Sequence, residues 1–143
     1  LSAITGRADI MDAMPAGALS GPYSGNPVAA AASVEVLRQL AEPGAMDRTL
    51  EIGKYLTAGL EQLQSKHSVI GEVRGHGALI GVELVDTNGA PNADASKAAM
   101  ERGLLIMAGG SDGHVLRLLP QLNISNELLD EALFILDEAF STL

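Results

Sequence analysis

The stretch that decides the fold is residues 69–85, which read VIGEVRGHGALIGVELV. Two short apolar runs, over 69–74 and 78–85, are separated by glycines and followed by the turn residues 86–89. Runs of this length between turn residues are typical of strands, whereas an amphipathic helix repeats its apolar residues every three or four positions. We therefore expect one strand in each run.

Helical periodicity precedes these strands and returns at the C-terminal end. The spacing predicts a helix over 47–66, with an apolar stripe of Leu50, Gly53, Leu56, Leu60 and Leu63. Asn26 and Pro27 have the residue types of an N-cap and a first helical position, and they predict a helix that ends near residues 42–44. Ser125 caps a last helix whose apolar face consists of Leu128, Leu129, Ala132, Leu133, Leu136 and Phe140.

The remaining expected elements are shorter: a strand end over 1–4, a helical turn over 7–14, a helix over 92–102, and a hairpin of strands 104–108 and 115–119. Together the elements predict an α+β fold, in which helices cover one side of a small, mostly antiparallel sheet. The first 26 residues are too few to bury a core. We therefore expect residues 1–26 to be a remnant of a larger domain and residues 27–143 to form a small C-terminal domain.

The composition sets limits on function. The chain has 143 residues, of which 47% are hydrophobic, which is enough for one folded domain with a core. Its net charge of −9, with nine scattered lysines and arginines, argues against nucleic-acid and acidic-membrane partners. The absence of cysteine excludes disulfides and thiolate catalysis and suits the cytoplasm. Because the chain begins at Leu1 with an apolar segment, we expect it to be a piece of something longer.

A loop of small residues, GALSGPYSGNP over 17–27, leads directly into the Ala-rich helix. Backbone N–H groups in such a turn can hold a phosphate, and Gly21, Tyr23 and Ser24 are the candidates here. On the loop's own evidence, an ordinary connector is the alternative interpretation.

Arg117 is the candidate substrate-binding residue. It lies in the middle of the expected strand VLRLLP, where a guanidinium is costly to bury unless it is paired. Its planar fork can hold a carboxylate with two hydrogen bonds. The alternative is a structural arginine on the solvent face of an alternating strand.

A second arginine, Arg74, has a structural interpretation. It follows an apolar run and is flanked by glycine, and we expect it to pair with a carboxylate such as the buried Glu83 or to cap carbonyls. The three histidines, His67, His76 and His114, lack metal-ligand spacing, so no metal site is expected.

Five segments in fixed order carry a family resemblance: LSAITGR (1–7), GPYSGNP (21–27), VRGHG (73–77), GVEL (81–84) and LRLLP (116–120). In this order they resemble the C-terminal third of a class III pyridoxal-phosphate aminotransferase, and within that family the 4-aminobutyrate aminotransferases. The resemblance implies a fold-type-I homodimer that moves an amino group from an ω-amino acid to 2-oxoglutarate through pyridoxal 5'-phosphate.

The resemblance also implies residue roles. Arg117 would bind the substrate carboxylate, and Gly21, Pro22 and Tyr23 would face the cofactor phosphate of the partner subunit. The position of Pro22 is usually a threonine in the family, whose hydroxyl and N–H bind the phosphate. Proline has neither group, so this contact cannot be made in the family's way.

No catalytic residue is expected in this chain, because the family's cofactor-binding lysine lies a few residues before the position of Leu1. The lysines present are expected on solvated helix faces, at Lys54, Lys66 and Lys97. We therefore expect the chain alone to be inactive. Two alternatives stay open: a non-catalytic dimerisation or binding module, and an aminotransferase of the ornithine or acetylornithine type.

Overall fold

The computed structural model describes residues 2–15, 17–18, 21–86, 88–90 and 92–143. The chain divides into two compact units, Leu1–Pro43 and Gly44–Leu143, and each is described by itself. The division lies after the helix that begins at Pro27. The assignment of residues 1–26 to a larger domain stays a prediction.

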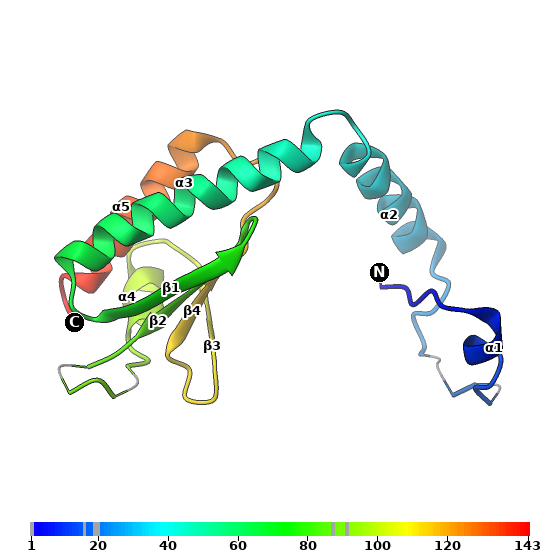
Figure 1. Ribbon diagram of the computed structural model, residues 1–143, viewed down its shortest axis with the longest axis horizontal. Helices are drawn as coiled ribbons and strands as arrows, with labels where there is room; N and C mark the ends of the chain where they lie inside the picture. The colour runs from blue at the N-terminus through cyan, green and yellow to red at the C-terminus, as the bar shows by residue number, and fades with distance from the viewer. Residues whose placement is uncertain (1, 16, 19–20, 87, 91) are drawn as a thin grey trace. The chain divides into compact units, whose positions relative to one another are not determined.

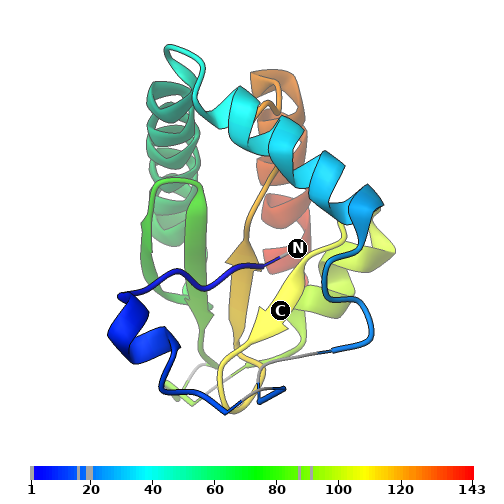
Figure 2. The same cartoon turned by 90° about the vertical axis from the view of Figure 1, so that its right-hand side faces the viewer.

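Over its described residues the unit 44–143 forms a four-stranded sheet and three helices, and Figure 1 shows how they are arranged. In chain order its elements are α3 (Ala45–Lys66), β1 (Ile70–His76), β2 (Leu79–Leu84), α4 (Ala95–Glu101), β3 (Met107–Gly109), β4 (Val115–Leu118) and α5 (Asn126–Phe140). The strand order is β1-β2-β4-β3, and every neighbouring pair is antiparallel. The predicted α+β fold with a small antiparallel sheet is confirmed. Figure 2 shows β3, in yellow, at the edge of the sheet beside β4.

The strand register separates the side chains into two faces. Ile80 pairs with Leu118 and Val82 with Leu116, and all four are buried against the helices. The alternate residues point away from this core, because successive side chains of a strand point to opposite faces. We call this second surface the open face; its members are exposed or half-buried and consist of Glu72, Arg74, His76, Leu79, Gly81, Glu83, Met107, Val115 and Arg117.

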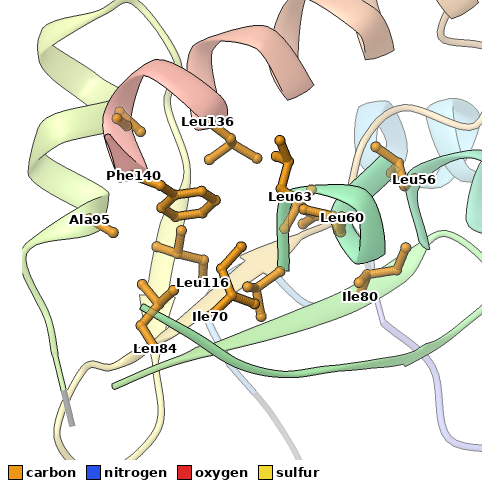
Figure 3. Close-up of a cluster of buried hydrophobic side chains, with 14 of the residues drawn as sticks. Leu56, Leu60, Leu63, Ile70, Ile80, Leu84, Ala95, Leu116, Leu136 and Phe140 are labelled. Atoms are coloured by element: carbon orange, nitrogen blue, oxygen red, sulfur yellow. The ribbon is translucent and has the colours of Figure 1, made fainter. Parts of the chain in front are cut away.

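The core lies between the sheet and the helices α3 and α5 (Figures 1 and 3). Figure 3 shows leucines of α3, Leu136 and Phe140 of α5, and Leu84 and Leu116 of the sheet meeting in one cluster. The predicted stripe of α3 is wrong at Leu50, which is 45% exposed, whereas Ile52 is fully buried. Leu50 lies about 160° around the helix from Ile52 at 100° per residue, so it cannot share the buried face.

One glycine allows α3 to contact the turn between β1 and β2. A Cβ atom at Gly53 would lie 2.1 Å from the carbonyl oxygen of Gly77, which is far inside van der Waals contact. Gly77 itself has φ +53, a conformation that glycine adopts without strain. The backbone of α3 therefore packs directly on the hairpin.

The described residues of the unit 1–43 form two helices, α1 (Ala8–Met11) and α2 (Pro27–Leu40). The predicted start of α2 is confirmed, because the Asn26 side chain accepts a hydrogen bond from the Ala29 N–H at 3.0 Å. The strand expected at 1–4 is absent over Ser2–Ile4, and Leu1 lies outside the described residues. None of the described residues of this unit is buried.

Candidate functional site

Arg117 lies on the open face of the sheet. Its neighbours along β4, Leu116 and Leu118, are buried, so the alternation of the strand turns Arg117 away from the core. Within the described residues Arg117 has no ion pair; its Nη2 donates to the Sδ atom of Met107 at 3.0 Å. A thioether is a weak, neutral acceptor. The guanidinium is therefore available to an anion.

The register places Arg117 in a row that crosses all four strands. Gly81 of β2 lies directly opposite Arg117 on one side, and Met107 of β3 on the other. Arg74 of β1 lies opposite Gly81 and completes the row. Because glycine has no side chain, no side chain separates the two arginines within the row.

Arg74 differs from Arg117 in its partners. Its Nη1 donates to Oε2 of Glu72 and to Oε2 of Glu83, each at 2.7 Å. The hydrogen bond to Glu83 and the charges of both carboxylates raise the pKa of Arg74. The predicted pairing with Glu83 is confirmed, although the Glu83 side chain is 34% exposed and not buried.

A mainly apolar hollow of about 570 Å³ lies beside Arg117 within the unit 44–143. Its walls come from residues 103–107, the end of β4 and α5, and they include Leu104, Met107, Leu119, Ile124, Leu128 and Ile135. The charged residues that line it are Arg117 and Glu131. Apolar walls with few polar groups are typical of small-molecule sites. This surface suits a ligand with an aliphatic part and a carboxylate.

The loop in the unit 1–43 forms two overlapping turns. The Gly21 carbonyl accepts from the Ser24 N–H at 3.0 Å, and the Tyr23 carbonyl accepts from the Asn26 N–H at 3.3 Å. The Gly21 N–H already donates to the Ser24 hydroxyl at 3.0 Å. Of the three N–H donors predicted for a phosphate, those of Gly21 and Ser24 are therefore occupied.

Two N–H groups of the loop remain without a partner among the described residues, those of Tyr23 and Gly25. Gly25 has φ +72, so a glycine there keeps the turn unstrained. Pro22 has no N–H to offer. The loop can therefore donate to the phosphate of a cofactor, but with donors other than those of the family's threonine.

No lysine lines the hollow among the residues that the structure describes. Lys54 and Lys97 are exposed, and Lys66 pairs with Asp137 at 3.0 Å. Among the residues that the structure describes, no three histidines or carboxylates gather as metal ligands. Over the same residues no helix is long and apolar enough to cross a bilayer.

Sequence reasoning missed Met107 as the partner of Arg117. The expected strands 104–108 and 115–119 do not define a register, whereas the observed ladder pairs Gly109 with Val115 and so places Met107 opposite Arg117. Only the register could have identified it.

The family model for aminotransferase class-III matches residues 1–140. The chain belongs to this family. It is 39% identical over 148 aligned residues to 5-aminovalerate aminotransferase DavT of Pseudomonas putida, covering all of this chain and 35% of that protein. It is 42% identical over 139 residues to 4-aminobutyrate aminotransferase of Mycobacterium tuberculosis, covering 93% of this chain and 31% of that protein.

Solved structures agree with the sequence comparison. The S-selective transaminase from Arthrobacter sp. with alanine bound matches 94% of this chain and 32% of its own, with a TM-score of 0.77 and 30% identity. The chain thus spans about a third of the length of the relatives it matches. The expected family is confirmed, and so is the fold class. The roles of Arg117, Gly21, Pro22 and Tyr23 stay predictions.

Proposed function

We propose that the protein to which this chain belongs transfers an amino group from an ω-amino acid to a 2-oxo acid, 2-oxoglutarate, and that Arg117 binds the substrate carboxylate. The observation that carries the proposal is Arg117, whose guanidinium has no ion pair among the described residues and which is one of the two charged residues beside an apolar hollow. The names of the relatives, 5-aminovalerate and 4-aminobutyrate aminotransferase, support the substrate class. In such substrates a methylene chain would pack on the apolar walls while the carboxylate pairs with Arg117.

The cofactor of this proposal is pyridoxal 5'-phosphate, which supplies the carbonyl that takes up the amino group and a ring that withdraws electrons. The described residues fit only its phosphate end. The free N–H groups of Tyr23 and Gly25 would donate to the phosphate, while Ser24 holds Gly21 in the turn. Pro22 contributes shape and no hydrogen bond.

The chain by itself does not transaminate, because its lysines are exposed or paired with Asp137 and none lines the hollow. The whole protein is a homodimer in which the loop over 21–26 contacts the cofactor of the partner subunit. An ornithine or acetylornithine substrate would also offer a carboxylate to Arg117, so the substrate names of the relatives, and not Arg117, favour the ω-amino acids.

The test uses the full-length protein with 5-aminovalerate as amino donor and 2-oxoglutarate as acceptor. Arg117→Ala should raise KM for the donor by about 30-fold to 100-fold, because it removes a charge-assisted hydrogen-bond pair. Arg117→Lys should recover part of the loss, since lysine keeps the charge but not the planar fork. Arg102→Ala, which removes a guanidinium bound to the Ala98 carbonyl on α4, is the matched control. An unchanged KM in Arg117→Ala would refute the proposed role.

A further inference from the structure

We propose that Arg74 is a positioning residue for the Arg117 site: by binding Glu83 it keeps this carboxylate from pairing with Arg117. The inference rests on the proposed function, in which Arg117 must stay free to bind a substrate carboxylate. It gives a role to the motif around Arg74 that the binding site itself does not use.

The register makes Glu83 a neighbour of Arg117. Glu83 lies directly opposite Val115 of β4, and Arg117 is two residues further along the same strand and on the same face. Diagonal neighbours of this kind are about 7–8 Å apart at their backbones, which is within reach of two long side chains. A released Glu83 would therefore compete with the substrate for Arg117.

Arg74 prevents this competition in two ways. Its Nη1 donates to Glu83 at 2.7 Å, which holds the carboxylate on the β1 side of β2. The same atom donates to Glu72 at 2.7 Å, and Glu72 lies directly opposite Glu83, where two like charges would otherwise repel. Without Arg74 this repulsion would push Glu83 away from Glu72, and the free guanidinium of Arg117 lies on its other side.

Gly81 makes the arrangement possible. It stands between Arg74 and Arg117 in the row, and a Cβ there would meet Val115 Cγ1 at 3.4 Å and Arg74 Cγ at 4.0 Å. A larger side chain at position 81 would fill the space between Glu83 and either arginine. The two arginines thus lie on either side of a residue that has no side chain to separate them.

The experiment measures the dissociation constant of valerate for the full-length protein by isothermal titration calorimetry. Valerate has the aliphatic chain and the carboxylate but no amino group, so its binding needs no turnover. Arg74→Met should weaken valerate binding about fivefold, the ratio that one exposed ion pair can contribute. Arg74→Met combined with Glu83→Gln should return the constant to within about twofold of the starting value. Thermal melts establish that each variant is folded.

The matched control separates competition from a general change in charge. Arg74→Met with Glu72→Gln restores the same net charge but leaves Glu83 ionised and free, so valerate binding should stay weak. If Glu72→Gln restores binding as well as Glu83→Gln does, or if Arg74→Met changes nothing, the role of Arg74 is refuted. A merely structural Arg74 would lower the melting temperature without this difference between the two glutamines.

The Arg117→Ala variant tests the role of Arg74 separately from the proposed substrate binding by Arg117. Loss of valerate binding in Arg117→Ala together with an unchanged Arg74→Met would refute the role of Arg74 and leave the proposed function standing. Undiminished binding in Arg117→Ala would overturn both. In the transamination assay Arg74→Met should raise KM for 5-aminovalerate and leave kcat unchanged. The reason is that Glu83 competes with the substrate for Arg117 only while no substrate is bound.

Discussion

The two units of the chain obey the same local rules but differ in what fixes their structure. Both α2 and α5 begin with a polar N-cap, Asn26 and Ser125, whose side chains accept hydrogen bonds from the first turn. Only the unit 44–143 adds a core, whereas no described residue of the unit 1–43 is buried. Local sequence is therefore enough to form α2, but only packing stabilises a tertiary fold.

The difference extends to the two candidate binding elements. Arg117 is carried by a strand that has hydrogen-bonded neighbours on both sides and a core beneath it. The loop over 21–26 is held only by its own turns and by the cap of α2. A site on a rigid sheet is preorganised by its unit, whereas the loop depends on contacts that the unit 1–43 does not itself provide.

The largest expected contrast between the units comes from removing one leucine side chain. Leu60 of α3 is fully buried, so Leu60→Ala should lower the free energy of unfolding by about 3–4 kcal/mol through lost burial and a new cavity. Leu37 of α2 is 65% exposed, and Leu37→Ala should change the same free energy by less than about 0.5 kcal/mol. Urea denaturation followed by circular dichroism measures both. Equal losses would show that α2 packs on a core after all.

A smaller contrast lies within α3. Gly53→Ala brings a Cβ to 2.1 Å from a carbonyl oxygen of the backbone, which cannot move aside, so we expect a loss of about 2–3 kcal/mol. At Gly59 the clash is with the side chain of Leu133 at 2.4 Å, which can change rotamer. The helix propensity of alanine also offsets part of the cost, so Gly59→Ala should lose about 1 kcal/mol or less. Urea denaturation measures the free energy of unfolding of both variants. Equal losses in Gly53→Ala and Gly59→Ala would contradict the close contact between α3 and Gly77.

Sequence reasoning succeeded where one local pattern determines the outcome. The helix start at Asn26 and the cap at Ser125 follow from side chains within one turn, and both are confirmed. The strand pair over 69–85 follows from the glycine-bounded apolar runs, and the pairing of Arg74 with Glu83 is confirmed as well.

Sequence reasoning failed where the outcome depends on the partner of an element. Leu128 of α5 is 54% exposed, because the side of the helix on which an apolar residue lies does not say whether another element covers it. The strand expected from 104 begins only at Met107, since Leu104 and Ile106 pack against the core without joining the ladder. The contact of Arg117 with Met107 depends on a register that the loop composition does not determine.

Removing the N-cap acceptor from α5 and from α2 compares the two units through the same chemical change. Ser125→Ala removes the acceptor for the Leu128 N–H at the start of a packed helix, and should lower the free energy of unfolding by about 1 kcal/mol. Asn26→Ala removes the equivalent acceptor from α2, and should leave the unfolding midpoint of the unit 44–143 unchanged. Its effect should appear only as a lower helical signal in circular dichroism. A shift of the midpoint by Asn26→Ala would link the stabilities of the two units.

The smallest expected effect is a difference in acid stability. Hydrogen bonds from His67 and Lys66 hold the pKa of Asp137 on α5 below its usual value. Because the folded pKa is lower than the unfolded value of about 3.9, the carboxylate stabilises the fold above about pH 5, and this contribution is lost as the pH falls through the folded pKa. Urea denaturation at a series of pH values measures the free energy of unfolding, whose fall at acid pH we call the acid limb. Asp137→Asn should reduce this fall by at most about 1 kcal/mol.

Glu35 on α2 is the matched control for Asp137 in the other unit. Hydrogen bonds from Arg38 and Gln39 lower the pKa of Glu35 to about 2, a shift of the same sign. Its partners lie on the same exposed helix, whereas Asp137 connects α5 to the end of α3. Glu35→Gln should therefore leave the acid limb of the unit 44–143 as it is, although the charge change is the same. If both variants flatten the limb equally, the profile reports net charge and not the link between α3 and α5.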